Sequence, residues 1–413
     1  MTADILLTHI HKLYTSSSKP PVHGKKMNEV VCIDDAFLAI KAEKILDFGS
    51  HSFLEYIGSM TEVIDCHKLI LTPGFIDSHT HLVHAGSREL ESIQIANQIP
   101  YLEILKHGGG ILSTVKETRN ASFDELYNKA SIVLDRMLSF GVTTIEAKSG
   151  YGLDVLTELK QLEVVKSLNL KHPIDIYSTY LGAHAIPKEF KDNRDEYTKL
   201  VLDQMKKIKE LNLANAVDVF FETDVFNYQE TKHILEKAKG LGFRIHLHAD
   251  EITSLGGAKL GIELKANSID HLMAISDDDI ALLKDTNTVC NLLPSTSFFL
   301  NKPFARARFL IDSSAAVAIS SDYNPGSAPS ENFQFSMQLA LFKMKLSPYE
   351  ILSATTINPA YHLGIDKEVG SISIGKKADL VLIEAPNLEY FYVNVGVNHV
   401  SKVYKSGKLV FSN

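Results

Sequence analysis

The central part of the sequence alternates between short apolar segments typical of β-strands and longer segments with helical periodicity. Strands that alternate with helices form parallel sheets, and eight of them in about 290 residues favour a closed (β/α)₈ barrel over a doubly wound sheet. The absence of a glycine-rich dinucleotide fingerprint after the first strand also weakens the doubly wound alternative. We therefore predict an α/β fold with an eight-stranded barrel, whose strand candidates are residues 75–79, 142–147, 175–180, 217–221, 243–248, 268–271, 288–292 and 317–321.

One helix between these strands is marked at both of its ends. Apolar residues recur every three or four positions from Leu126 to Leu138, which places them on one helical face. Ser122 and Glu125 form the pattern of a capping box, and Gly141 stands where a C-terminal cap belongs. The segment between these signals is therefore predicted to be an amphipathic helix.

The two ends of the chain differ in character from its middle. Residues 1–68 contain short β-rich segments separated by glycine turns, and residues 365–413 contain similar segments. We predict that the two ends fold together into one small β domain. The barrel, residues 69–364, would then be inserted between them.

Composition and charge narrow the possible classes of function. The net charge of −8 gives no basic surface for nucleic acid, and no apolar run approaches the roughly 20 residues of a membrane-spanning helix. The first residues lack the basic and apolar blocks of a signal peptide. The three cysteines Cys32, Cys66 and Cys290 lie far apart, so we expect neither disulfides nor a cysteine-rich zinc site. These features predict a cytoplasmic protein that binds neither nucleic acid nor membranes.

The first predicted barrel strand ends in two histidines separated by one threonine. Residues i and i+2 of a strand point to the same side, so His79 and His81 can converge on one point. Two converging imidazoles can supply half of the ligands of a divalent metal ion. Two unconnected polar residues are a weaker interpretation, because an apolar run, Pro73-Gly74 and the histidines occur together.

Further polar residues lie at the ends of later predicted strands. Strand five contributes His246, His248 and Glu251, strand six contributes His271, and strand eight contributes Asp322. Because TIM barrels concentrate their chemistry at the C-terminal ends of their strands, these side chains should meet. Three histidines and one aspartate suit zinc or a similar first-row ion. They also leave a position for water, whose pKa the ion would lower.

These motifs resemble those of the amidohydrolase superfamily of metal-dependent hydrolases. The resemblance covers nearly the whole chain and includes residues 73–81, Asp322 and the exit segment 375–380. It implies a distorted (β/α)₈ TIM barrel with a small β-sandwich domain built from both chain ends. This architecture agrees with the division of the chain described above.

Longer segments are similar to those of the imidazolonepropionase family. They are residues 81–89, 148–153, 180–184, 248–251 and 321–327. The resemblance implies a hydrolase that acts on the cyclic amide C–N bond of 4-imidazolone-5-propanoate and forms N-formimino-L-glutamate in histidine degradation. It also implies one divalent or trivalent metal ion per subunit, zinc or iron. A homodimer is expected on the same ground.

The resemblance assigns roles to individual residues of this sequence. The implied metal ligands are His79, His81, His248 and Asp322. The implied substrate contacts are Arg88, Tyr151, His184 and Glu251, with Asn324, Gly326 and Ser327 in a product-binding loop. The implied catalytic residues are Glu251, His271 and Asp322, and we expect Glu251 to move a proton to the departing ring nitrogen.

Two features of the metal site stay open at this point. His246 shares a strand face with His248, and His248 is favoured only because its spacing to Glu251 matches the resemblance. His246 would then orient a ligand instead of binding the ion. One ion is the simpler interpretation, although Glu222 at the end of strand four could bridge a second. The donor set does not separate zinc from iron.

Three alternative functions are weighed. A deaminase acting on an aromatic or cyclic amidine could use the same metal ligands, and it would release ammonia where lactam opening releases none. A hydantoinase or dihydroorotase is weaker, because strand four does not end in lysine. A barrel that has lost catalysis and serves as a scaffold is the alternative from another class, since folds outlive functions.

Overall fold

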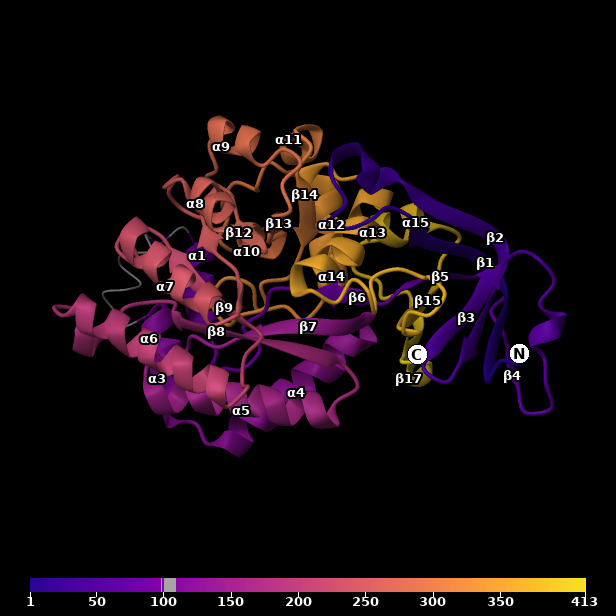
Figure 1. Ribbon diagram of the computed structural model, residues 1–413, viewed down its shortest axis with the longest axis horizontal. Helices are drawn as coiled ribbons and strands as arrows, with labels where there is room; N and C mark the ends of the chain where they lie inside the picture. The colour runs from indigo at the N-terminus through magenta and orange to yellow at the C-terminus, as the bar shows by residue number, and fades with distance from the viewer. Residues whose placement is uncertain (98, 100–108) are drawn as a thin grey trace.

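The first of two β-sheets contains strands from both ends of the chain. It is seen in a computed structural model that describes residues 1–97, 99 and 109–413. The strand order is β17-β16-β15-β5-β1-β2-β3, with β4 beside β1. In Figure 1 its indigo and yellow strands lie together at the end of the molecule where both termini are marked. The strands are β1 (Ile5–Ser16), β2 (Val30–Lys41), β3 (Lys44–Gly49), β4 (Glu62–Asp65), β5 (Leu69–Pro73), β15 (Leu380–Glu384), β16 (Val400–Lys405) and β17 (Lys408–Ser412).

β5 joins the two chain ends within this sheet. It runs parallel to β1 and antiparallel to β15. Alternate residues of the joined strands, among them Leu7, Leu38, Leu71 and Leu382, form an apolar core of their own. The pairing of the two ends in one sheet is therefore confirmed, while the division into domains at residues 68 and 365 stays a prediction.

The second sheet is a nearly closed parallel barrel, as predicted. Its order is β14-β13-β12-β11-β9-β8-β7-β6, with β10 beside β9. Every predicted strand forms, although the first and last end two residues earlier than expected. The strands are β6 (Phe75–Asp77), β7 (Val142–Lys148), β8 (Asp175–Ala183), β9 (Ala216–Phe221), β10 (Arg244–Ile245), β11 (His248–Ala249), β12 (Ser268–His271), β13 (Val289–Leu292) and β14 (Ala316–Ile319).

The fifth barrel strand departs from the prediction because it is split into β10 and β11. His246 still donates its backbone N–H to the Val217 carbonyl at 3.0 Å. The backbone N–H of His248 instead reaches a side chain, Asp218 Oδ1, at 3.2 Å. The regular ladder with β9 is interrupted where this carboxylate replaces a carbonyl as acceptor. Apolar alternation in the sequence cannot reveal such a replacement.

The barrel closes just beyond the ends of β6 and β14. Asp322 donates its backbone N–H to the His79 carbonyl at 3.1 Å, and His81 donates to the Tyr323 carbonyl at 2.8 Å. Closer to the strands themselves, Ser321 donates its backbone N–H and its hydroxyl to the Asp77 carboxylate, at 2.9 and 2.5 Å. The first and eighth strands are therefore joined through the segments that carry predicted metal ligands.

Helices cover the outside of the barrel (Figure 1). The helix after Ser122 is confirmed with its capping box, and its apolar face is buried. Within the described parts of the chain, no helix is long and apolar enough to cross a membrane. The helices are α1 (Glu89–Ala96), α3 (Ile111–Asn120), α4 (Phe123–Ser139), α5 (Val155–Lys171), α6 (Arg194–Glu210), α7 (Tyr228–Gly240), α8 (Gly257–Leu264), α9 (Asp277–Leu282), α10 (Pro294–Phe299), α11 (Ala307–Asp312), α12 (Phe333–Met344), α13 (Pro348–Thr355), α14 (Ile357–Leu363) and α15 (Leu388–Val393), with short 3₁₀ turns η1 (Gly24–Asn28), η2 (Leu54–Tyr56) and η3 (Lys188–Phe190).

Candidate metal centre and active site

Three histidines meet at the C-terminal end of the barrel. His79 and His81 follow β6, and His248 begins β11. One ring nitrogen of each lies within 4.8 Å of those of the other two, and all three side chains are buried. Asp322 follows β14, and its Oδ1 lies 3.4 Å from His79 Nε2 and 3.5 Å from His81 Nε2. The structure thus brings together the four side chains that the resemblance implied as metal ligands.

The surroundings of these rings fit a metal ion. His79 Nδ1 lies 2.5 Å from Asp270 Oδ2, and His248 Nδ1 lies 2.8 Å from Asp218 Oδ2. Asp270 hydrogen-bonds to His79, and Asp218 forms an ion-pair contact with His248, so that each carboxylate lies beside Nδ1 and leaves Nε2 for the group. Both Nε2 atoms are buried without a hydrogen-bond partner, which is unfavourable unless another ligand satisfies them. A carboxylate behind a metal-binding histidine is a common arrangement, so these three histidines could hold an ion.

The carboxylates behind the histidines belong to a buried charged cluster that the sequence analysis missed. Lys148, at the end of β7, places its Nζ 2.8 Å from both Glu146 and Asp218 and 3.8 Å from Asp270. Burial lowers the pKa of Lys148, but these three carboxylates outweigh it and raise that pKa above its usual value. The available signal was the presence of charged residues at inward positions of otherwise apolar strands.

The two histidines of strand five have different environments. His246 Nδ1 lies 2.9 Å from Glu146 Oε1, and its ring packs against the buried ring of His362 at 4.4 Å between centroids. It is not part of the group formed by the three metal-directed histidines. The structure therefore separates His246 from His248, which strand alternation alone could not do.

Glu251 and His271 lie beside the three histidines. Glu251 Oε2 is 3.6 Å from His271 Nε2, and the His271 ring is 5.0 Å from that of His248. Burial, followed by the charges of Asp322 and Glu222, raises the pKa of Glu251 to about 8. Burial also lowers the pKa of His271 to about 3, which keeps its imidazole neutral. A carboxyl group that titrates near neutrality is suited to proton transfer.

Glu222 is engaged by the loop that follows Glu251. Its Oε2 accepts the backbone N–H groups of Ile252 and Thr253 at 2.9 and 3.1 Å, and its Oε1 accepts that of Thr223 at 2.8 Å. Both oxygens therefore have backbone donors. This arrangement gives Glu222 a role in holding the loop.

An aromatic group lines the other side of the histidines. The His184 ring stacks on His81, with 4.9 Å between centroids and 12° between planes. Tyr151 lies 5.6 Å from His81 and 5.4 Å from His184. His184 Nδ1 is 3.0 Å from the Gly150 carbonyl, and burial lowers the pKa of His184 to about 3. Nδ1 therefore donates to that carbonyl, which leaves Nε2 as an acceptor.

Arg88 lies at the start of α1, against the loop that follows Asp322. Its Nε and Nη2 donate to Glu91 Oε2 at 2.9 and 2.7 Å. A Cβ at Gly326 would lie 2.0 Å from Arg88 Nη1, so only glycine admits the guanidinium here. Asn324 fixes this loop by accepting the backbone N–H groups of Gly326 and Ser327, both at 2.8 Å.

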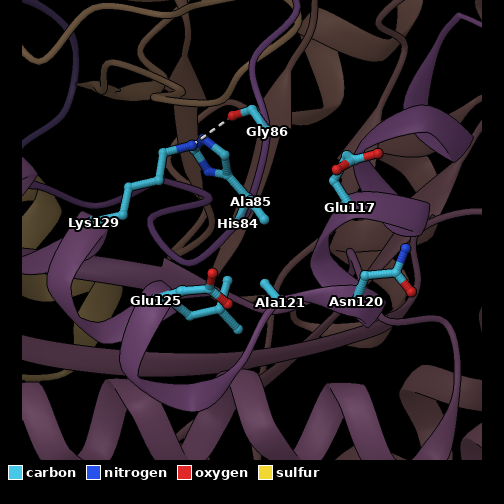
Figure 2. A pocket seen from close by; sticks show the side chains of 9 residues that line it. His84, Ala85, Gly86, Glu117, Asn120, Ala121, Glu125 and Lys129 are labelled. Carbon is cyan, nitrogen blue, oxygen red and sulfur yellow. Dashed lines mark hydrogen bonds between the residues drawn. The ribbon is translucent and has the colours of Figure 1, made fainter.

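Two cavities flank the segment between His81 and Arg88. One, of about 340 Å³, is shown in Figure 2, where Lys129 donates to the Gly86 carbonyl at 2.6 Å and thereby ties this segment to α4. The second, of about 420 Å³, lies beside α1 and α3 and includes Arg88 and Glu91 in its lining. The first cavity is lined by His84, Ala85, Gly86, Glu117, Asn120, Ala121, Glu125, Leu126 and Lys129.

Comparisons with known proteins agree with this arrangement. The model of the Amidohydrolase family matches residues 70–410. An imidazolonepropionase of Fusobacterium nucleatum is 47% identical over 100% of both chains. Those of Bacillus cytotoxicus and Streptococcus pyogenes serotype M6 are 48% and 46% identical, over 99% of this chain and 97% and 98% of theirs.

Solved structures of other enzymes share the fold. Guanine deaminase of E. coli superimposes with a TM-score of 0.75 at 15% identity, covering 99% of both chains. An adenosine deaminase of Xanthomonas campestris with bound zinc gives 0.73 at 17% identity, covering 100% of this chain and 93% of its own. At such identities the likeness concerns architecture alone. Family membership rests on the full-length sequence matches, from which we conclude that the chain belongs to the amidohydrolase family and, within it, to the imidazolonepropionases.

Proposed function

We propose that this chain hydrolyses the cyclic amide C–N bond of 4-imidazolone-5-propanoate to give N-formimino-L-glutamate. The observation that carries this function is the full-length identity of 46–48% to relatives named imidazolonepropionase. These relatives favour ring opening over deamination, and the intact group of buried histidines argues against a non-catalytic scaffold. The substrate is a small molecule.

We further propose that His79, His81, His248 and Asp322 hold one metal ion, zinc or iron. Support comes from the buried Nε2 atoms of His79 and His248 and from the carboxylates that direct them. Such an ion, when bound, supplies Lewis acidity that polarises a carbonyl group and lowers the pKa of water. Asp322 is held by the Thr296 hydroxyl, which donates to its other oxygen, Oδ2.

Glu251 is proposed to manage the proton of the reaction. The bond between the ring carbonyl carbon and the ring nitrogen breaks, and the oxygen of water joins that carbon to form a carboxylate. One proton of the water must reach the departing nitrogen, and the other is released to solvent as the carboxylate forms. Glu251 can accept the first of these protons and deliver it, because its carboxylate is buried beside the histidines, 3.6 Å from His271 Nε2, where a bound cation would favour the ionised form that accepts a proton. His271, 3.6 Å away, would orient its carboxyl group.

Arg88 is proposed to anchor the propionate of the substrate. A guanidinium group offers a planar pair of donors that matches a carboxylate. Asn324 holds the backbone of Gly326 and Ser327 in place, and Gly326 lies against this guanidinium, as required of a loop that would contact substrate and product. Tyr151 and His184 flank His81 and would confine the ring of the substrate. Such positioning contributes to the rate in addition to metal activation.

The activity is tested by incubating purified protein with freshly generated 4-imidazolone-5-propanoate and following the loss of its ultraviolet absorbance. We expect turnover that a chelator abolishes and that added zinc or iron restores. Product analysis should find N-formimino-L-glutamate without ammonia. Ammonia release would instead indicate a deaminase, and protein without bound ion or turnover would indicate a scaffold.

Glu251→Gln tests the proton-transfer role separately. This variant should retain its metal but lose most of kcat, since an amide cannot exchange a proton with water or the ring. Metal content is measured on the same samples. Near-normal turnover would remove Glu251 from the mechanism.

A cytoplasmic location is also proposed. The free thiols of Cys32, Cys66 and Cys290 support it, because a reducing compartment keeps cysteines unpaired. The homodimer stays a prediction from the family. Sedimentation analysis of the full chain would measure it directly.

A further inference from the structure

Lys148 occupies the centre of the buried charged cluster inside the barrel. Its ammonium lies 2.8 Å from Asp218 Oδ2, 2.8 Å from Glu146 Oε2 and 3.8 Å from Asp270 Oδ2. None of these four side chains is exposed to solvent. Three carboxylates thus share one cation where water cannot screen them. Removal of that cation would leave their negative charges uncompensated and would disturb the arrangement of the three side chains.

Two of these carboxylates also contact the metal-directed histidines. Asp218 Oδ2 lies 2.8 Å from His248 Nδ1, and Asp270 Oδ2 lies 2.5 Å from His79 Nδ1. In each aspartate the oxygen that faces the histidine is also the one nearest Lys148. Asp218 Oδ2 therefore joins the ammonium directly to His248, whereas Asp270 Oδ2 connects it to His79 across the longer distance of 3.8 Å.

We propose that Lys148 is a positioning residue for the metal centre, whose ammonium fixes the two aspartates that orient His79 and His248. This inference rests on the proposed binding of metal by those histidines. Without the ammonium, a buried aspartate would lose the cation that holds its carboxylate in place and would rotate toward another donor. This rotation would loosen the orientation of the imidazole, on which metal affinity depends.

Glu146 offers a matched control within the same cluster. Glu146 contacts the same ammonium at 2.8 Å. The imidazole that it contacts is that of His246, at 2.9 Å. His246 is not one of the three metal-directed histidines. A change at Glu146 thus alters the buried charge around Lys148 without touching an aspartate that orients a ligand.

The experiment measures zinc affinity in the full-length protein. Lys148→Met, Glu146→Gln and the double variant are stripped with a chelator and titrated with Zn²⁺ against a chromophoric competitor. We expect Lys148→Met to weaken zinc binding about tenfold, as changes behind metal ligands do, and Glu146→Gln to change it less than about threefold. The visible spectrum of Co²⁺-loaded protein should shift in Lys148→Met, because the ligand geometry changes.

The double variant covers the case in which Lys148→Met does not fold. It removes one positive and one negative charge, so the net buried charge is preserved. It should bind zinc about tenfold more weakly than Glu146→Gln alone. Wild-type affinity and an unchanged Co²⁺ spectrum in Lys148→Met, or an equal loss in Glu146→Gln, would overturn the role of Lys148. Absence of zinc binding in the wild-type protein would contradict the metal centre itself.

Discussion

Replacement of Glu251 by glutamine should alter the pH dependence of folding stability as well as catalysis. Burial, together with Asp322 and Glu222, raises the pKa of Glu251 from 4.5 to about 8 in the folded protein. Between these two values the folded state holds a proton that the unfolded chain has released. The contribution of Glu251 to stability is therefore present below pH 4.5 and is lost as the pH rises through 8.

The magnitude follows from the width of this window. Each pH unit in which one group is protonated only in the folded state changes stability by about 1.4 kcal/mol, so three units give about 4 kcal/mol. Glutamine at position 251 does not titrate. The stability of Glu251→Gln minus that of the wild type should thus increase by about 4 kcal/mol between pH 5 and pH 8.

Urea unfolding of chelator-treated protein at pH 5, 6, 7 and 8 measures this difference. The metal must be removed because a bound cation favours the ionised carboxylate and would mask the effect. Glu384→Gln, which changes an exposed glutamate in β15, controls for the amide substitution and should follow the wild type. A stability difference between Glu251→Gln and wild type that stays constant over this range would refute the reasoning.

Three further predictions concern substrate anchoring and the helical frame. Arg88→Ala should lower kcat/KM for the propionate substrate about 10- to 100-fold through the loss of a charged pair of hydrogen bonds; steady-state kinetics check this, and an unchanged value would place the carboxylate elsewhere. Gly326→Ala should reduce kcat/KM at least about tenfold, because a Cβ 2.0 Å from Arg88 Nη1 displaces the guanidinium. Gly240→Ala is the control and should keep wild-type kinetics, because a Cβ added at Gly240 would meet no neighbouring group within 4 Å. Ser122→Ala should remove the capping box of α4 and lower the free energy of unfolding by about 1 kcal/mol, measured in urea; no change would mean that the cap contributes nothing.

Local patterns were sufficient to predict most of the fold. Strand length, helical periodicity and caps are properties of neighbouring residues, and the β12 prediction, for example, matches Ser268–His271 at both ends. The pairing of His79 with His81 was also predictable, because strand alternation is local. Convergence with His248 followed only once a barrel was assumed, since that fold brings all strand ends to one rim.

The distinction between His246 and His248 was beyond local patterns. Strand alternation puts both side chains on one face of the predicted strand, and both are buried, but their environments differ through residues far away in the chain. His246 meets Glu146 from β7 and His362 from α14, whereas His248 meets Asp218 from β9. A single sequence carries no direct signal of these contacts.

The buried cluster behind the histidines shows a signal that was present but not interpreted. Glu146 and Lys148 are two positions apart on β7, and Asp218 lies in the middle of β9. Ionised residues inside otherwise apolar strands are rare, and they require partners. Their presence could have indicated a charged layer, although the members of the cluster come from three different strands, β7, β9 and β12.

The seam between the first and eighth strands has a consequence for how the barrel stays closed. The backbone hydrogen bonds across this seam join Asp322 to His79 and His81 to Tyr323. Three of the four proposed metal ligands therefore also form the seam. A cation bound there would hold the two edges of the seam together, because its ligands come from both of them. Chelation should accordingly speed hydrogen–deuterium exchange at the amides of His81 and Asp322 more than at those of β9, which lies across the barrel from the seam.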